Sequence, residues 1–269
     1  MAKISKTSYP DGVYPPSDDT FLLVDALAYD VAGAASGKKS KMVSNILPLD
    51  ANKVCTVVEL GCGSGFVAAS AALLLPLAYV LGTDLSSRAC LASKKTFESH
   101  DCSSYSDVIA SESLSSIKSS LTFDIILANP PYVPTSTEEL SESLAILRTE
   151  TRQKPLLDSA GDRETENAAF TLTWAGGEDG IEMTKRMLKA ALSHLSLDGG
   201  RLYLVVVAEN HPDELTKYAA QLWDEIWAEK YQKLLVEAEG RKQPTLSAAI
   251  AVQTRANNEL LSVLRFCLY

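Results

Sequence analysis

The chain has 269 residues, of which 46% are hydrophobic and 22% are charged. This balance suits one large α/β domain with a buried sheet and excludes a natively disordered chain. The formal net charge is −9, which argues against binding through neutralised phosphates, because such binding needs clustered Lys and Arg side chains. Nucleic acid is therefore disfavoured as a partner.

The five cysteines show no C-x-x-C pair or other close metal-ligand spacing. We expect reduced, buried thiols and no metal site in this chain. No apolar run approaches the roughly 18 residues that a membrane span needs, and the first residues lack the apolar core of a signal peptide. These features predict no membrane contact and a location in the cytoplasm or the nucleus.

From residue 54 onward, short apolar runs alternate with helical patterns, which predicts βαβ units around a parallel sheet. The predicted strands cover residues 54–60, 79–83, 107–110, 123–128 and 201–207, and the predicted helices cover 66–75, 86–99, 181–195 and 212–227. Two β-rich runs, 246–252 and 260–268, are expected to end the chain as an antiparallel hairpin.

The remaining segments have weaker patterns. Ser17 or Asp18 is predicted to cap a helix that continues through residues 21–28. Residues 33–44 are expected to form a flexible link, and residues 225–242 a charged helix extension. The stretch 134–173 is long, polar and aperiodic, which indicates either a lid or a mobile insertion.

A glycine-rich turn, Glu59-Leu60-Gly61-Cys62-Gly63-Ser64-Gly65, follows the first predicted strand and opens a helix. Its glycines let backbone amides approach a ligand, although many folds use such a turn only to reverse the chain tightly. Asp84 ends the second predicted strand, where a carboxylate can accept both hydroxyls of a ribose. The pair indicates an adenosine-containing cofactor. NAD is disfavoured, because its pyrophosphate usually goes with G-x-G-x-x-G.

Asn129-Pro130-Pro131-Tyr132 follows the fourth predicted strand, at the edge where open α/β sheets bind ligands. The prolines hold Asn129 extended, so its side-chain oxygen and the Pro130 carbonyl form two fixed acceptors for a planar nitrogen with two hydrogens. Tyr132 can stack on the flat target group. Taken alone, the segment could be an ordinary turn. Beside the glycine turn, it predicts methylation of an exocyclic amine or amide.

The alternating glycines behind Glu59 resemble motif I of the Rossmann-like methyltransferases. The resemblance implies an α/β fold with a seven-stranded, mostly parallel sheet, helices on both faces and a C-terminal antiparallel hairpin. It also implies S-adenosyl-L-methionine as the cofactor. The implied cofactor-binding residues are Thr20, Glu59, Gly61, Gly63, Gly65, Asp84, Leu85, Ser111, Glu112 and Asn129.

The resemblance assigns different parts of the cofactor to these residues. Glu59 would support the loop, and Asp84 would bind the ribose. Close relatives carry Asp after the third strand to bind the adenine amino group, whereas this chain has Ser111 followed by Glu112. Either Glu112 substitutes for the missing acid, or Ser111 makes a weaker contact. Glu112 could also be an exposed acid in the first turn of a helix.

Residues 13–23, 173–180 and 260–266 look like the eukaryotic and archaeal HemK-like release-factor glutamine methyltransferases. The resemblance places Thr20 beside the cofactor and residues 174–180 at the substrate end of the pocket. The alternatives are a helix start for Thr20 and an ordinary Gly-Gly turn.

The predicted organisation is one methyltransferase domain over the whole chain. It comprises an N-terminal helical extension (1–53), a cofactor half with the catalytic segment (54–132), a variable insertion (133–175) and a C-terminal half (176–269).

The resemblance implies methylation of the glutamine in the Gly-Gly-Gln motif of the eukaryotic class I translation termination factor, bound to its GTPase partner. It also implies a heterodimer with a small zinc-binding activator subunit. Asn129, Pro130, Pro131 and Tyr132 would bind the substrate, with Asn129, Pro130 and Tyr132 catalytic. Adenine or a protein lysine could use the same pocket, but base flipping from a duplex needs cations that this acidic chain lacks. A catalytically silent scaffold is a third hypothesis, suggested by Ser111.

Overall fold

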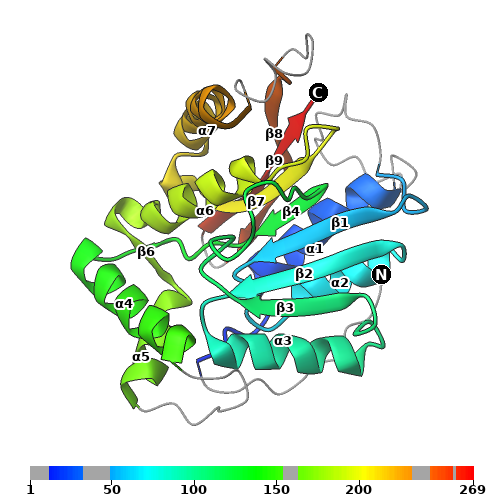
Figure 1. The fold of residues 1–269 in the computed structure, drawn as a ribbon. Coiled ribbons are helices and arrows are strands. Elements are labelled where there is room, and N and C mark those ends of the chain that lie inside the picture. Colours follow the sequence, from blue (N-terminus) through cyan, green and yellow to red (C-terminus); the bar gives the residue numbers. More distant parts are fainter. Residues whose placement is uncertain (1–11, 33–48, 154–162, 232–242, 257–258) are drawn as a thin grey trace.

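The computed structural model describes residues 12–32, 49–153, 163–231, 243–256 and 259–269, and its main sheet has the strand order β3-β2-β1-β4-β7-β9-β8 (Figure 1). These strands are β1 (Cys55–Leu60), β2 (Ala78–Asp84), β3 (Ser106–Ala110), β4 (Ile125–Ala128), β7 (Arg201–Val207), β8 (Leu246–Ala256) and β9 (Glu259–Leu268). The first five strands in the spatial order are parallel, and β9 and β8 add an antiparallel hairpin at one edge. The predicted fold class is confirmed.

Helices cover both faces of this sheet (Figure 1). α1 (Asp18–Ala32), α2 (Phe66–Leu74) and α3 (Ser87–Ser99) pack on one face, and α6 (Glu182–Ser193) and α7 (Pro212–Ile226) pack on the other. Along β4, Ile125 and Leu127 point to the first layer, whereas Ile126 and Ala128 point to the second. Because successive side chains alternate between two buried faces, the strand is apolar throughout.

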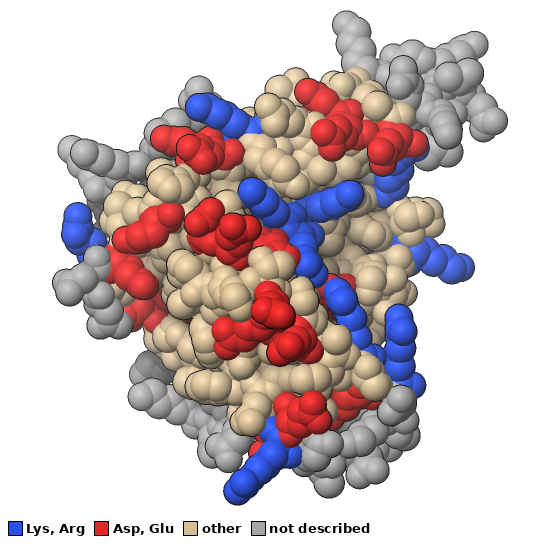
Figure 2. Space-filling view, turned by 90° about the vertical axis from the view of Figure 1, so that its left-hand side faces the viewer, with Lys and Arg blue, Asp and Glu red and all other residues tan. Residues whose placement is uncertain are grey.

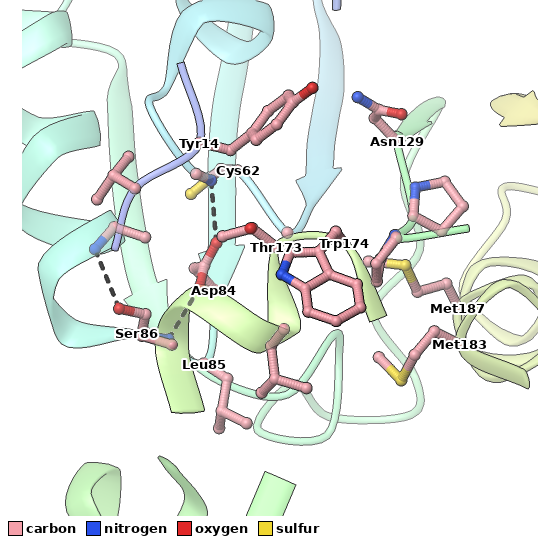
Figure 3. A pocket seen from close by; sticks show the side chains of 18 of the residues that line it. Tyr14, Cys62, Asp84, Leu85, Ser86, Asn129, Thr173, Trp174, Met183 and Met187 are labelled. Atoms are coloured by element: carbon pink, nitrogen blue, oxygen red, sulfur yellow. Dashed lines mark hydrogen bonds between the residues drawn. The ribbon is translucent and has the colours of Figure 1, made fainter. Parts of the chain in front are cut away.

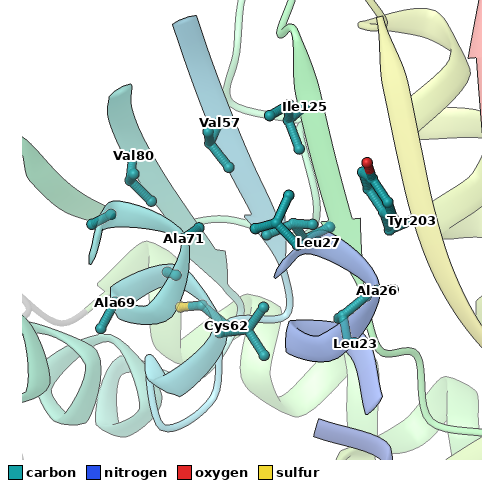
Figure 4. Packing of buried hydrophobic residues seen from close by; sticks show 14 of the residues in the cluster. Leu23, Ala26, Leu27, Val57, Cys62, Ala69, Ala71, Val80, Ile125 and Tyr203 are labelled. Atoms are coloured by element: carbon teal, nitrogen blue, oxygen red, sulfur yellow. The ribbon is translucent and has the colours of Figure 1, made fainter. Parts of the chain in front are cut away.

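The first layer packs closely because its helices present small or branched side chains to the sheet. Leu23 and Leu27 of α1 are fully buried against Tyr203 of β7, and Ala71 of α2 lies over Val57 of β1 (Figure 4). The alanines of α2 let its backbone approach the sheet directly behind the glycine-rich turn. This packing fixes where the turn ends and the helix begins.

A buried ionic cluster ties α1 to the far half of the sheet. Asp30 accepts a hydrogen bond from Tyr203 Oη at 2.5 Å and one from Arg201 Nη1 at 3.2 Å, and it also accepts one from Arg265 Nη1 of β9. Arg265 is 1% exposed, and Asp30 is 6% exposed. Removal of the single carboxylate would leave buried guanidinium charge without its counterion.

The start of α1 and the predicted strands are close to their expected positions. The Ser17 carbonyl accepts the Phe21 amide at 2.9 Å, and the Ser17 amide donates to Thr20 Oγ1 at 3.2 Å, so Ser17 is the residue at the predicted helix start. The strand predicted at residues 123–128 begins two residues later, because Phe123 forms only an isolated bridge with Leu195.

The expectation of an aperiodic stretch at residues 134–173 is wrong for the residues that the structure describes. They form α4 (Thr137–Gln153) and α5 (Arg163–Leu172). Leu140, Leu144 and Leu147 recur at helical spacing and are buried, but the Ser, Glu and Thr residues between them obscure this stripe in the sequence. Both helices have acidic first turns, which favours helix formation.

Short elements complete the fold. They are β5 (Val133–Pro134), β6 (Ala175–Gly177), η2 (Glu178–Gly180), η3 (Ala208–Asn210) and a π-helical turn, η4 (Trp227–Tyr231). The predicted link at residues 33–44 and most of the charged extension, residues 232–242, lie outside the described residues. No helix in the described ranges is long and apolar enough to span a membrane.

Candidate active site

One cavity lies at the carboxyl ends of β1, β2 and β4 and holds about 1300 Å³ of empty space, part of it open to solvent. This is the edge where open α/β sheets bind ligands. The predicted site residues that line the cavity are Thr20, Glu59, Gly61, Gly63, Asp84, Leu85, Glu112, Asn129, Pro130, Pro131 and Tyr132. The cofactor side and the catalytic segment therefore share one space.

The glycine-rich turn is shaped by backbone angles that favour glycine. Gly61 and Gly63 have φ values of 68° and 49°, and no atom outside the adjacent residues lies within 4 Å of a Cβ built on Gly63. The Glu59 carboxylate accepts the Ala68 amide of α2 at 2.8 Å, and burial raises the pKa of Glu59 well above its ordinary value. Glu59 thus fastens the turn to the helix and leaves the glycine backbone open to a ligand.

Asp84 is held beside this turn by two backbone amides. Its Oδ2 accepts Gly63 N–H, and its Oδ1 accepts Ser86 N–H, both at 2.9 Å (Figure 3). Burial raises the pKa of Asp84, while these backbone donors oppose the shift. A carboxylate has about four acceptor positions, so Asp84 can accept two further hydroxyl groups. This arrangement suits the 2′- and 3′-hydroxyls of a ribose.

Asn129 supplies the acceptor on the opposite side of the cavity (Figure 3). Its Oδ1 is buried and has no hydrogen-bond partner among the residues that the structure describes. Asn129 lines the cavity, and most buried polar atoms are paired, so its Oδ1 is a candidate acceptor for a donor that arrives with a ligand. A planar amide nitrogen is such a donor.

Asp19 connects the cofactor side of the cavity with the catalytic segment, and it was not identified from the sequence as a site residue. Its Oδ1 accepts the Thr20 amide at 2.6 Å, and its Oδ2 accepts Tyr132 Oη at 3.3 Å. Burial and the charge of Asp19 raise the pKa of Tyr132, so the phenol stays neutral and donates. In the sequence, an acid in the first turn of a helix is explained by the helix dipole alone.

The Trp174–Gly180 segment packs against the backbone of the catalytic segment and of the residue that follows it. Val133 N–H donates to the Trp174 carbonyl at 2.9 Å, which joins β5 to β6. Gly180 has a φ of +70°, and a Cβ at this position would lie 2.1 Å from the Tyr132 carbonyl oxygen. Trp174 itself lines the cavity. Only glycine permits this approach, so the turn fixes the backbone that carries Asn129 and Pro130.

Two predicted cofactor residues have other roles. Gly65 does not line the cavity; a Cβ there would lie 2.6 Å from the Ser93 Cα, so this glycine allows α2 to pack against α3. Ser111 is 2% exposed, its hydroxyl lies 3.3 Å from the Ser115 hydroxyl, and it accepts the Ser116 amide at 3.2 Å. Its hydroxyl is used inside its own turn and not at the cavity surface.

Glu112 reaches the cavity, but its carboxylate is already paired. Arg148 of α4 donates to it through Nε at 2.6 Å and through Nη2 at 2.7 Å. Arg186 of α6 lies 3.9 Å away. Glu112 therefore joins two helices at the cavity and is not an exposed first-turn acid.

Further cavity residues had no distinctive signal in the sequence. Tyr14 lies ahead of α1, and Met183 and Met187 are one turn apart on α6 (Figure 3). Methionines at helical spacing normally indicate core packing, and both are indeed nearly buried. Among the described residues, no group of three or more His, Cys, Asp or Glu side chains is arranged to hold a metal ion.

The comparisons with known proteins agree with this geometry. The family model described as Methyltransferase small domain matches residues 35–155. The eRF1 methyltransferase catalytic subunit mtq2 of Schizosaccharomyces pombe is 30% identical over 207 residues, which cover 74% of each chain. Methyltransferase HEMK2 of Mus musculus is 30% identical over 261 residues, covering 94% of this chain and 89% of that protein.

A bacterial relative matches a smaller region. The release factor glutamine methyltransferase of Rhodopirellula baltica is 29% identical over 150 residues, which cover 55% of this chain and 43% of the relative. The two eukaryotic relatives, in contrast, match over most of their lengths. The chain therefore belongs to the methyltransferase family that includes HEMK2 and the eRF1 methyltransferase catalytic subunit.

Proposed function

We propose that this chain transfers a methyl group from S-adenosyl-L-methionine to the side-chain amide nitrogen of the Gly-Gly-Gln glutamine in the class I translation termination factor. The names of its relatives describe methylation of eRF1 and of release-factor glutamine. The observation that carries the proposal is the buried, unpaired Oδ1 of Asn129, a residue that lines the cavity. It offers an acceptor to an amide N–H.

The residues present fit the cofactor. The positive φ angles of Gly61 and Gly63 and the open space beside Gly63 suit its amino-acid part, and Asp84 suits its ribose. Thr20 lines the same cavity. Bound S-adenosyl-L-methionine would supply an electrophilic methyl group on its sulfonium.

The catalytic segment orients the acceptor nitrogen. Asn129 Oδ1 and the Pro130 carbonyl would each accept one N–H of the glutamine amide, which holds the nitrogen lone pair perpendicular to the amide plane. Both acceptors stabilise the positive charge that grows on this nitrogen during transfer. No strong base is needed, because the methylated nitrogen becomes acidic enough to lose its proton to water. Tyr132 would contact the flat amide group.

The charge distribution supports a protein substrate. Acidic side chains form several groups on the face that contains α4 and α6, and basic side chains lie among and beside them (Figure 2). Such a mixed face does not offer the continuous positive surface that a nucleic-acid duplex requires. A loop of a protein substrate needs no such surface.

We also propose that a small zinc-binding activator subunit pairs with this chain, with the zinc held by that partner. Four large apolar side chains, Val54, Leu77, Tyr79 and Leu121, are 47–64% exposed. They lie at or just before the amino ends of β1, β2 and β4, at the edge opposite the cavity. A subunit bound there would cover apolar surface without blocking the active site.

The proposed location of the protein is the cytoplasm, because termination factors act there.

The test is methylation of a defined glutamine. The chain, co-expressed with the activator, is incubated with methyl-labelled cofactor and the termination factor bound to its GTPase partner. We expect one methyl group on the Gly-Gly-Gln glutamine by mass spectrometry, and none when the substrate carries Asn at that position. Label on duplex adenine or on a histone lysine, with none on the termination factor, would contradict the proposal.

A further inference from the structure

We propose that α4 and α5 form the adenine subsite of the cavity, and that Glu112 serves it by positioning Arg148 and α4. The proposal rests on the proposed use of S-adenosyl-L-methionine. The surface concerned is the α4–α5 wall, defined as Leu144, Leu147, Ala169 and Leu172, all of which line the cavity.

The order of the strands locates the base. Asn129 follows β4, the glycine-rich turn follows β1, and Asp84 ends β2, while β3 lies next to β2 on the outer side. Neighbouring strands are about 4.8 Å apart, so a ligand that reaches from Asn129 to Asp84 crosses three strand ends. With its methyl group near Asn129 and its ribose at Asp84, its base extends towards the end of β3.

The α4–α5 wall lies at that place. Leu85, the residue after the ribose acid, packs against both apolar clusters that α4 and α5 form. Thr151 of α4 donates from Oγ1 to the Leu85 carbonyl at 2.8 Å. Figure 1 shows α4 and α5 on the same side of the molecule as the carboxyl ends of β2 and β3. A flat, mostly apolar base fits between such side chains.

Two polar residues after β3, Ser111 and Glu112, are each engaged by neighbouring side chains or amides. The Ser111 hydroxyl is used by Ser115 and Ser116. The Glu112 carboxylate is held by two hydrogen bonds from Arg148, in the bidentate geometry that favours a lasting pair. The acid expected to bind the adenine amino group thus acts through Arg148, as a positioning residue.

Other contacts fasten the same unit. Arg88 of α3 donates to Glu166 of α5 at 2.7 Å, and Ser87 Oγ lies 3.5 Å from a carboxylate oxygen of Glu150 on α4. The contacts join both helices to the first turn of α3, directly after Asp84. The base is therefore bound by apolar surface whose position depends on ion pairs, and not by an acid on its 6-amino group.

Binding of S-adenosyl-L-homocysteine by isothermal titration calorimetry tests the wall directly. Leu172 lines the cavity and is only partly buried, so Leu172→Ala should weaken binding about tenfold, since it removes apolar contact with the base. Leu172→Met should retain most of the affinity, because it keeps the volume. Thr149→Ala is the control, because Thr149 is exposed on α4, and its affinity should equal that of the wild type. Thermal unfolding without ligand identifies any variant that does not fold.

Charge reversal tests the positioning role. Glu112→Arg and Arg148→Glu should each weaken binding, and the double variant should recover it, as expected for a pair that acts through its geometry. Equal losses without recovery in the double variant would overturn this role of Glu112.

A ligand analogue separates apolar recognition from an acid contact. The analogue of S-adenosyl-L-homocysteine that lacks the 6-amino group should bind within about threefold of the parent, whereas loss of a hydrogen bond to a buried carboxylate would cost about tenfold or more. A tenfold loss, or unchanged affinity in Leu172→Ala, would overturn the inference while leaving methylation of the termination factor intact. Failure of the wild type to bind the parent ligand would overturn the proposed function as well.

Discussion

Replacement of Asn129 by alanine removes the unpaired acceptor and leaves the rest of the cavity in place. Asn129 Oδ1 is buried and without a partner among the described residues, so no existing hydrogen bond is lost in the free enzyme. Loss of one positioned group that stabilises developing charge lowers turnover by about 10²–10³, or about 2.7–4 kcal/mol. Cofactor affinity should change by less than about threefold, because the ribose acid and the glycine-rich turn are on other strands.

The assay measures the two quantities separately. Single-turnover methylation of the termination factor gives the chemical step, and calorimetry with S-adenosyl-L-homocysteine gives the affinity. Asn129→Asp is the matched variant, since it keeps the size and an oxygen acceptor, and it should retain more activity than the alanine variant. Equal losses of affinity and turnover in Asn129→Ala, or turnover within about tenfold of the wild type, would refute the division of roles between Asn129 and the cofactor side.

The remaining predictions concern the backbone, the ribose acid and the core. Gly180→Ala places a Cβ 2.1 Å from the Tyr132 carbonyl oxygen at a residue with a φ of +70°. Steady-state kinetics should show that turnover is reduced at least about tenfold. Gly199 also has a positive φ but no atom near its Cβ position, so Gly199→Ala should stay active. Burial raises the pKa of Asp84, so cofactor affinity should persist above that pKa and fall as pH decreases through it, whereas calorimetry on Asp84→Asn should show no such step. Asp30→Ala should lower the free energy of unfolding in urea by about 3–5 kcal/mol, because it strands the buried Arg265; a loss below about 1 kcal/mol would contradict the importance of this ion pair.

Local signals predicted the part of the site that lies on single strand–turn units. Glu59 lies near the end of β1, and Gly61 to Gly65 and Asn129 to Tyr132 each directly follow a buried strand, so the end of that strand fixes their place at the sheet edge. Asp84 was found for the same reason, as the last residue of β2. In these cases the residues that matter lie within one turn of the strand that positions them.

Contacts between distant segments account for what was missed. Glu112 pairs with Arg148 across 36 residues, and Asp19 pairs with Tyr132 across 113. No spacing rule connects such positions, because the partner depends on how α4 packs and on where α1 crosses the sheet. The helical stripe of α4 was obscured for a related reason, since its apolar residues are few and are completed by Leu85, α5, Ala175 of β6 and Met183 of α6.

The pairing of the carboxylates bears on which nitrogen the cavity favours. Asp19, Glu59, Asp84 and Glu112 line it, and each already accepts hydrogen bonds from neighbouring donors. Asn129 Oδ1, a neutral acceptor, is buried without a partner among the described residues. A lysine side chain, with an ordinary pKa of about 10.4, must lose a proton before it can accept a methyl group, and each of these carboxylates is already hydrogen-bonded to neighbouring donors. A glutamine amide is neutral, needs two acceptors and needs no prior deprotonation, so the cavity favours an amide nitrogen over an ammonium group.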